Sequence, residues 1–260
     1  MKKYIQILKI SARNQLAYLP AFLARNLFFV LVVFIFASLW RAIYADRPLL
    51  AGRTMTQVLW YLTLTEVVEL SKTNVYMTIQ EEVKDGTIAY TLTRPFSYIV
   101  YYFFQAMGQN LVKMGPMLVE AFLLGTIFAG VLPGYFRAIP FGIFLIVGGL
   151  GVVTLWQIII GLLAFWFEEV SPFYWIMQKL VFIIGGMFFP IDLFPEWLQG
   201  ISKASPFAFS AYWPAITIVD FSFSSFYTCL LGQVGYSILL LLAAAGLYGA
   251  AVRKVHVQGG

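Results

Sequence analysis

Apolar stretches long enough to cross a lipid bilayer constrain this chain more than any other feature. The hydrocarbon core of a bilayer is about 30 Å thick, so a helix needs about 20 mostly apolar residues to cross it. Lipid offers the backbone no hydrogen bonds, so such stretches fold as helices. The sequence predicts six of them, at about 22–43, 55–77, 98–131, 141–166, 173–189 and 226–252. We therefore expect an all-α integral membrane protein with six transmembrane helices, forming a single transmembrane domain over residues 1–260.

Composition agrees with this class and excludes several others. Hydrophobic residues make up 61% of the chain and charged residues 11%, whereas about a quarter of a soluble domain is charged. The net charge of +5 is spread over the ends of the predicted spans, without the clustered basic face of a nucleic-acid-binding protein. Cys229 is the only cysteine and His256 the only histidine. We therefore expect no internal disulfide, no metal, no bound cofactor and no nucleic acid partner.

The amino-terminal residues 1–20 begin with basic residues but lack the apolar core and cleavage site of a signal peptide. One side of a helical wheel carries Lys2, Gln6, Lys9 and Arg13, with Ile5, Leu8, Ala12 and Leu16 beside them. This pattern predicts an interfacial helix on the anionic cytoplasmic leaflet. The alternative is a basic leader that only fixes orientation. Basic residues near both chain ends predict that both termini are cytoplasmic.

The most polar stretch, residues 79–96, follows the second predicted span. Its apolar positions recur at spacings of four, five and four, which is one stripe of a helix interrupted at Gly86: Ile79, Val83, Ile88 and Leu92. Gly86 can take a positive φ, and Arg94-Pro95 disfavours helix just before the third span. We expect a short amphipathic helix on the cytoplasmic side that docks into a soluble partner. An ordinary charged loop is the alternative.

The motifs in this stretch resemble the coupling helix of type-2 ATP-binding-cassette (ABC) exporter permeases. In that family the helix follows the second span and fits a cleft on the ATPase subunit. The Gly…Leu-x-Arg-Pro part resembles a subgroup encoded as two different permeases plus one ATPase. The resemblance implies a coupling helix at 79–95, two ATPase copies as partners and a second permease, either a paralogue or an identical copy. The ATPase-coupling residues that it implies are Glu81, Glu82, Gly86, Thr87, Leu92, Arg94 and Pro95.

A second resemblance to the same family follows the fifth predicted span. The family has a Gly…Phe-Pro…Phe-Pro-x-Trp-Leu segment there, which folds as short helices that partly re-enter the outer leaflet. Aromatic residues interleaved with prolines suit such half-inserted helices, because protein contacts satisfy the broken backbone. We expect an external re-entrant segment at 190–225, introduced by the end of the fifth span. Its characteristic residues are Gly186, Phe189, Pro190, Pro195, Trp197 and Pro206.

The second predicted span carries three charged residues at i+3 spacing, Glu66, Glu69 and Lys72. A charge at the bilayer centre costs about 2.5–3.5 kcal/mol on insertion scales, so these groups should face protein or water. They would line a translocation path or the seam between two permeases. The alternative is a purely structural Glu69–Lys72 pair. Lys113 and Glu120 of the third span are placed to meet this stripe.

Glu168 and Glu169 follow the fourth predicted span on the cytoplasmic side and would form a second contact with a basic ATPase surface. A solvated turn within an aromatic belt is the simpler interpretation. Adjacent carboxylates point in different directions, so a glycosidase-type acid–base pair is excluded.

These observations favour the permease subunit of an ABC exporter in a bacterial-type cytoplasmic membrane, surrounded by lipid. No Walker-type Gly-Lys-Ser/Thr loop is present, so ATP and Mg²⁺ would bind on a separate ATPase polypeptide. The substrate class would be amphiphilic: a drug, a lipid or a glycan. An ion-coupled secondary carrier that titrates Glu66, Glu69 and Lys72 is the alternative. An intramembrane enzyme is disfavoured, because no nucleophile–base or metal constellation appears.

Overall fold

The computed structural model describes residues 2–16 and 19–253. Within these residues all regular secondary structure is helical, apart from an isolated bridge between Leu50 and Arg53. The α-helices, in chain order, are α1 (Lys2–Leu16), α2 (Leu19–Ile43), α3 (Met55–Ser71), α4 (Val75–Lys84), α5 (Ile88–Leu92), α6 (Tyr98–Ala129), α7 (Tyr135–Leu162), α8 (Ser171–Ile183), α9 (Glu196–Ala204), α10 (Tyr212–Val219) and α11 (Phe223–Val252). Two short 3-10 helices lie at η1 (Leu163–Phe165) and η2 (Ile191–Leu193).

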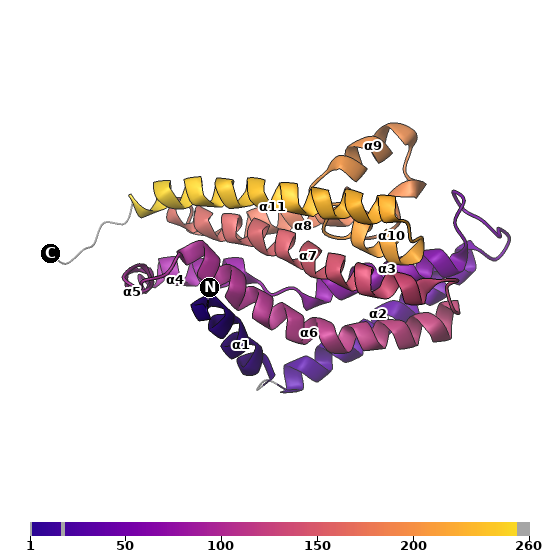
Figure 1. Ribbon diagram of the computed structural model, residues 1–260, viewed down its shortest axis with the longest axis horizontal. Coiled ribbons are helices and arrows are strands. Elements are labelled where there is room, and N and C mark those ends of the chain that lie inside the picture. Colours follow the sequence, from indigo (N-terminus) through magenta and orange to yellow (C-terminus); the bar gives the residue numbers. More distant parts are fainter. Residues whose placement is uncertain (1, 17–18, 254–260) are drawn as a thin grey trace.

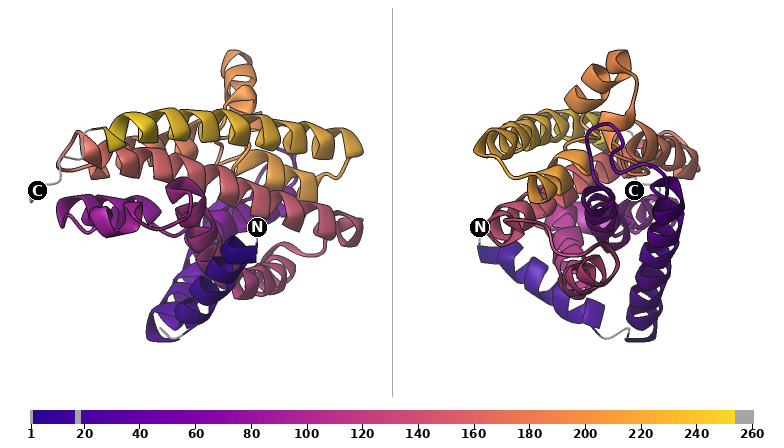
Figure 2. Two further views of the ribbon diagram at one scale, coloured as in Figure 1. Left: turned by 60° about the vertical axis from the view of Figure 1, so that its left-hand side comes forward. Right: turned by 90° about the vertical axis from the view of Figure 1, so that its right-hand side faces the viewer.

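The long helices run side by side along the long axis of the molecule (Figure 1). One end, which we call the coupling end, carries α4, α5 and the last turns of α11. The opposite end, which we call the outer end, carries the 44–54 loop and the turn between α6 and α7. The short helix α9 stands away from the bundle in every view (Figures 1 and 2). The polar connections therefore gather at the two ends of a helical body.

Four helices in the described part of the chain are long and apolar enough to cross a membrane by length and composition: α2, α6, α7 and α11. The second and fifth predicted spans correspond to α3, with 17 residues, and α8, with 13 residues. At a rise of 1.5 Å per residue, a helix as long as α8 measures about 20 Å, less than the hydrocarbon thickness. Six full crossings therefore stay a prediction, whereas the all-α membrane class is confirmed.

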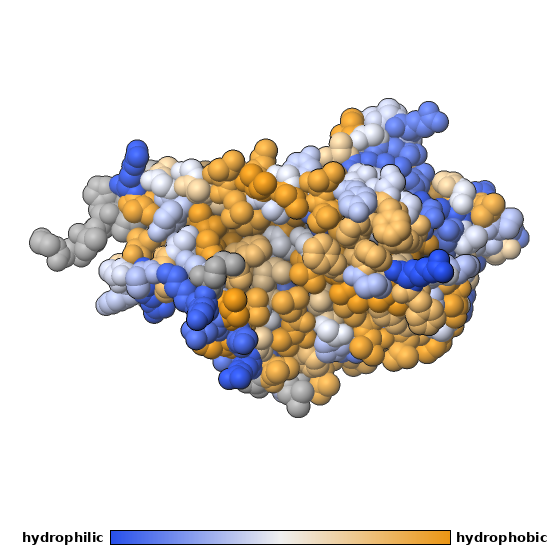
Figure 3. Space-filling view, viewed as in Figure 1, coloured by the Kyte–Doolittle hydropathy of each residue, from blue (hydrophilic) through white to orange (hydrophobic). Residues whose placement is uncertain are grey.

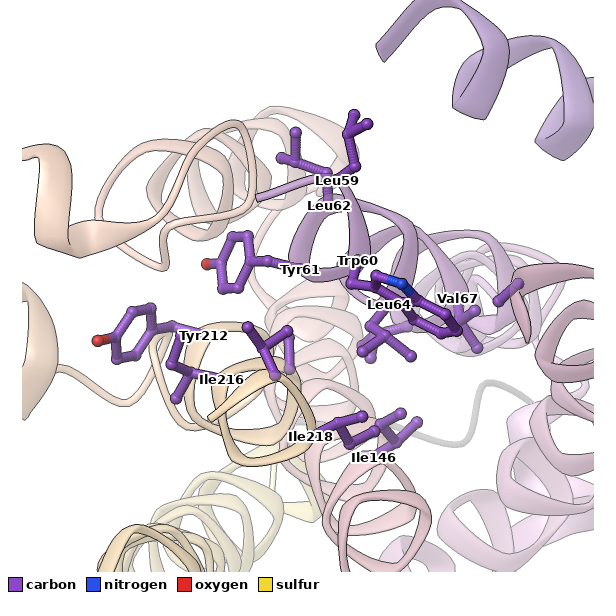
Figure 4. Close-up of a cluster of buried hydrophobic side chains, with 14 of the residues drawn as sticks. Leu59, Trp60, Tyr61, Leu62, Leu64, Val67, Ile146, Tyr212, Ile216 and Ile218 are labelled. Atoms are coloured by element: carbon purple, nitrogen blue, oxygen red, sulfur yellow. The ribbon is translucent and has the colours of Figure 1, made fainter. Parts of the chain in front are cut away.

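The centre of the molecule is built around α3, whose side chains are buried along almost its whole length. In Figure 4, Tyr61 of α3 lies beside Tyr212 of α10, and Ile218 of α10 beside Ile146 of α7. Gly142 of α7 permits this packing, because a Cβ there would meet Cγ1 of Ile218 at 1.9 Å. The short helix α10 is thus held inside the bundle between α3 and α7.

The surface separates into an apolar middle and polar ends. Figure 3 shows apolar residues over most of the visible flank and hydrophilic residues gathered towards the extremities. Large exposed side chains on the long helices are apolar, for example Leu27 and Phe34 of α2 and Leu231 and Leu242 of α11. Apolar surface on this scale is the mark of a protein whose solvent is lipid.

The helix α1 packs against the first half of α6. The carbonyl oxygen of Leu8 would lie 2.3 Å from a Cβ on Gly108, so the glycine permits the close approach of the two backbones. The basic residues of α1, Lys2, Lys3, Lys9 and Arg13, are exposed. Residues 1, 17 and 18 of the predicted interfacial segment lie outside the described residues, as do Lys254 and His256.

Candidate coupling site

The predicted coupling segment folds as two short helices, α4 and α5, joined at Gly86. The chain turns because Gly86 has φ 70°, in the left-handed region that favours glycine. Its amide donates a hydrogen bond to the carbonyl of Val83 at 3.3 Å, as expected just beyond a helix end. No atom lies within 4 Å of the position of a Cβ on Gly86. The need for glycine here is therefore conformational and not steric.

The inner face of this segment is apolar and packs on the bundle. The four stripe residues Ile79, Val83, Ile88 and Leu92 join one hydrophobic cluster with Tyr98 and Tyr102 of α6, Ile158 and Leu162 of α7 and Ala244 of α11. Ile79 is fully buried. A Cβ on Gly161 would lie only 2.8 Å from Cβ of Ile79, so α4 touches α7 almost backbone to backbone. A displacement of α4 would therefore press directly on α7.

The acidic pair of the segment is divided between its two faces. Glu82 points inward: Oε1 accepts a hydrogen bond from Thr91 Oγ1 at 3.1 Å and Oε2 accepts one from the Tyr98 hydroxyl at 3.2 Å. Glu82 thereby joins α4, α5 and α6. The side chain of Glu81 is exposed and makes no hydrogen bond or ion pair within residues 2–16 and 19–253. The two adjacent carboxylates thus stand in different environments.

The outer face of α4 and α5 is mixed in character. Its exposed side chains include Met77, Thr78, Glu81, Lys84, Asp85, Thr87, Tyr90 and Arg94. Tyr90 is 73% exposed, which is unusual for a large aromatic side chain in a helix that buries its other face. Aromatic, methionine and arginine side chains are enriched at protein-binding surfaces, and this face exposes one of each in Tyr90, Met77 and Arg94.

A second loop at the coupling end, residues 166–170, is fastened to α4. Gln80 Oε1 accepts a hydrogen bond from the backbone amide of Val170 at 2.8 Å. Lys84 Nζ lies 3.1 Å from Glu169 Oε2. Glu169 Oε1 also accepts hydrogen bonds from the Ser171 hydroxyl at 2.6 Å and from the Ser171 amide at 3.1 Å. The carboxylate of Glu169 is therefore engaged within the chain.

The hydrogen bonds from Ser171, followed by the contact with Lys84, lower the pKa of Glu169 to about 2. Glu169 accordingly stays ionised over all ordinary pH values. Glu168, its neighbour, is exposed and makes none of these contacts.

The amino-terminal helix holds the far end of the coupling segment, an arrangement with no local signal in the sequence. Lys3 Nζ donates a hydrogen bond to the Pro95 carbonyl at 2.5 Å. The amide of Ser97 donates one to the hydroxyl of Tyr4 at 3.0 Å. The two residues of the first pair are 92 positions apart in the chain, and those of the second pair are 93 positions apart. Only the tertiary fold brings them together.

The charged stripe of α3 faces α8. Glu69 forms an ion pair with Lys72 and accepts a hydrogen bond from Gln178 Nε2 at 3.0 Å. Glu66 is about nine-tenths buried, and its side chain makes no hydrogen bond or ion pair within the described part of the chain. The stripe thus contains one ion pair, Glu69–Lys72, and one carboxylate without such a partner, that of Glu66.

The two charges of α6 do not pair with this stripe. Lys113 Nζ donates to Thr73 Oγ1 at 2.6 Å, just beyond the end of α3. Glu120 Oε2 is buried and has no hydrogen-bond partner among the described residues.

The outer end contains an ion cluster that the sequence did not predict. Asp192 of η2 forms ion pairs with Arg53 at 2.7 Å and with Lys203 of α9 at 2.8 Å. It also accepts a hydrogen bond from the hydroxyl of Tyr212 of α10 at 2.8 Å. Burial alone would raise the pKa of Asp192, but the hydrogen bond from Lys203 and the charge of Arg53 outweigh it and lower the pKa below its usual range. One carboxylate therefore ties the 44–54 loop to three later elements.

The residues singled out after the fifth predicted span occupy this outer end. Gly186 has φ 77°, and its carbonyl accepts a hydrogen bond from the buried hydroxyl of Tyr61. Pro190 and Pro195 precede η2 and α9, and Pro206 lies in the turn between α9 and α10. Phe189 is exposed, and Trp197 on α9 is 71% exposed.

The fold is that of a multi-pass α-helical membrane protein. At its coupling end, α4 and α5 form a surface-exposed turn of two helices joined at Gly86, which we call the elbow. Within the described residues, no group of three or more histidine, cysteine, aspartate or glutamate side chains is placed to hold a metal ion. The model of the ABC-2 family transporter proteins matches residues 10–259, nearly the whole chain, so the chain belongs to the ABC-2 transporter family. It is an ABC permease, a membrane transport component of a family without an ATPase domain of its own. A search of curated proteins found no significant match.

Proposed function

We propose that this chain is the permease subunit of an ABC exporter, and that α4 and α5 are the elements through which a separate ATPase drives it. The observation that carries the proposal is the two-sided elbow at Gly86. Its inner stripe packs on α6, α7 and α11, while its outer face presents Met77, Glu81, Asp85, Tyr90 and Arg94. A helix whose inner face packs on the spans and whose outer face binds a partner can transmit the partner's motion to the spans.

In the assembled transporter, two ATPase copies would bind ATP and Mg²⁺, and each would receive one elbow. The second permease would be a paralogue of this chain or an identical copy. The coupling end would then face the cytoplasm, with both termini on that side of a bacterial-type cytoplasmic membrane. We further propose that α1 lies along the inner surface and that η2, α9 and α10 form the re-entrant segment on the outer side. The cargo would be amphiphilic.

Within the elbow we assign different roles to the predicted coupling residues. Glu81, Thr87 and Arg94 would contact the ATPase, because they are exposed. Glu82, Gly86, Leu92 and Pro95 would shape the elbow, since they bond, turn or pack within the chain. Glu168 remains a candidate for a second ATPase contact, whereas Glu169 fastens the loop to α4.

The proposal is tested by co-purification of the chain with a co-expressed ABC ATPase subunit. Glu81→Lys and Tyr90→Ala should each reduce recovery of the ATPase at least tenfold, because both change the exposed face and leave the packed face intact. Glu196→Lys is the matched control, since Glu196 is an exposed residue of α9 at the outer end. Undiminished recovery with both elbow variants would contradict the assignment.

Glu66 supports a second candidate, an ion-coupled carrier, because a buried carboxylate without a bonded partner suits proton exchange. Reconstituted vesicles that hold this chain without an ATPase would show proton-driven substrate movement if this candidate were correct. Glu66→Gln would abolish that movement.

A further inference from the structure

The linker between α3 and α4 consists of Lys72, Thr73 and Asn74, and a side chain of another residue holds each of them. Lys72 pairs with Glu69 of its own helix. Thr73 Oγ1 accepts a hydrogen bond from Lys113 Nζ of α6 at 2.6 Å, and Asn74 Oδ1 accepts one from the Tyr174 hydroxyl of α8 at 3.3 Å. Connecting segments are ordinarily more mobile than the helices they join, whereas every side chain of this linker has a partner.

Both contacts from outside the linker come from buried side chains. Lys113 is 5% exposed and Tyr174 is 4% exposed. A buried ammonium group is costly unless it is bonded, and Lys113 makes no ion pair within the described part of the chain. The hydroxyl of Thr73 is the only hydrogen-bond partner of the Lys113 side chain in that part. The side chain is thus committed to the linker and to nothing else.

The contact with α8 continues into the first turn of α4. The ring of Tyr76 stacks on the ring of Tyr174, with centroids 4.2 Å apart and planes at 18°. Lys72 Nζ lies 5.6 Å from the centroid of the same Tyr174 ring. One aromatic side chain of α8 therefore touches residues on both sides of the point where the helix is interrupted.

Lys72 has an extended backbone, with φ −66° and ψ 146°, so α4 is not a continuation of α3. A break of this kind would let α4 swing independently of the spans, since a few residues at an element's end absorb hinge motion. The contacts of Lys113 and Tyr174 oppose that freedom. They connect the base of α4 to α6 and to α8.

We propose that Lys113 and Tyr174 are positioning residues that clamp the 72–74 linker, so that a displacement of α4 passes directly to α6 and α8 as well as along the chain to α3. The clamp is a property of the chain alone. Its use in transport rests on the function proposed above, in which the ATPase supplies the displacement.

The clamp itself is tested without any partner, by amide hydrogen exchange of the chain in lipid nanodiscs. Thr73→Val and Tyr174→Phe each remove one hydrogen bond and keep the shape of the side chain. A bond of about 0.5–1.5 kcal/mol corresponds to a rise of about twofold to tenfold in the exchange of the α4 amides. Thr126→Val and Tyr227→Phe are matched controls, because Thr126 bonds only within its own helix and Tyr227 is exposed. Unchanged exchange in α4 for both clamp variants would overturn the proposal.

Transmission is tested in the assembled transporter with spin labels, in a Cys229→Ala background. Thr78→Cys reports on α4 and Ile183→Cys on α8, each paired with Leu242→Cys on α11; all three positions are exposed. Adding ATP and orthovanadate should change both distances in the parent protein. In the Thr73→Val, Tyr174→Phe double variant, the change in the distance between labels 78 and 242 should persist. The change in the distance between labels 183 and 242 should fall at least twofold.

The outcomes separate the two proposals. A full change at 183 in the double variant would overturn the clamp as a transmitter. No change at 78 in the parent complex would instead contradict the coupling role of α4, and the exchange experiment would still decide whether the clamp exists.

Discussion

The hydroxyl of Tyr98 donates a hydrogen bond to Glu82 at 3.2 Å, and this contact gives two adjacent carboxylates different roles. Glu82 is held between α4, α5 and α6, whereas the side chain of Glu81 is exposed. The two glutamates form one acidic motif in the sequence, but Glu82 has a structural role and Glu81 is available for binding.

Substituting these two residues singly should therefore have unequal effects on stability. Glu82→Ala leaves the hydroxyls of Thr91 and Tyr98 without their acceptor and should lower the free energy of unfolding by about 1–3 kcal/mol. Glu81→Ala should change it by less than about 0.5 kcal/mol, as usual for an exposed site. Equilibrium unfolding in mixed micelles measures both. Equal losses for the two variants would contradict the division of roles.

Replacement of Gly86 should cost stability through backbone strain alone. An alanine at φ 70° is disfavoured by about 1–2 kcal/mol. No neighbouring atom would meet its Cβ, so no steric term is added. Gly200 of α9 is the matched control: its surroundings are equally open, but its conformation is helical, and Gly200→Ala should stabilise by about 0.5–1 kcal/mol. The sign of the change should differ between the two variants in the same unfolding assay.

Packing of α4 on α7 should depend on Ile79 more than on any exposed residue of the helix. Ile79→Ala removes a fully buried side chain and should destabilise this contact by about 2–5 kcal/mol. Met77→Ala, on the exposed face, should have little effect on the isolated chain. Hydrogen exchange in α4 distinguishes them, with fast exchange expected only for Ile79→Ala. Similar protection in both variants would show that the contact with Gly161 does not anchor α4.

The depressed pKa of Glu169 makes its contribution nearly independent of pH. The pKa of an ordinary glutamate is about 4.3. Because the folded-state pKa is about 2, the stabilisation is fully present above the ordinary value and is lost as the pH falls through about 2. The hydrogen bond from the Ser171 hydroxyl is the largest single cause, so Ser171→Ala, which keeps only the backbone bond, should raise the pKa of Glu169, and Lys84→Met should raise it as well. Carboxyl ¹³C titration, with Glu169→Gln to assign the signal, measures both shifts, and an unchanged pKa in Ser171→Ala would contradict this account.

Local patterns in the sequence predicted the elbow well. The spacing of Ile79, Val83, Ile88 and Leu92 follows the helical period, and that period determines which face is buried. Gly86 marked the turn because few other residues accept its backbone conformation. The all-helical membrane class followed from hydropathy, since lipid leaves the backbone no other solution.

Contacts between distant residues could not be predicted in this way. Arg53 and Asp192 are 139 positions apart, and no local periodicity relates them. The length of α8 was overestimated for a different reason. Apolar composition continues from Ile184 to Phe189, but the helix ends at Ile183, and Gly186 then takes a positive φ. Hydropathy reports where lipid or protein surrounds a residue and not where the helix stops.

The bonds of Lys3 to Pro95 and of Tyr4 to Ser97 have a practical consequence for anyone who purifies this protein. An affinity tag fused ahead of Lys2 would sit beside the elbow and obstruct the surface that we propose binds the ATPase. A tag inserted in the 44–54 loop would instead project from the opposite end of the bundle, and is the better choice for capturing an intact complex.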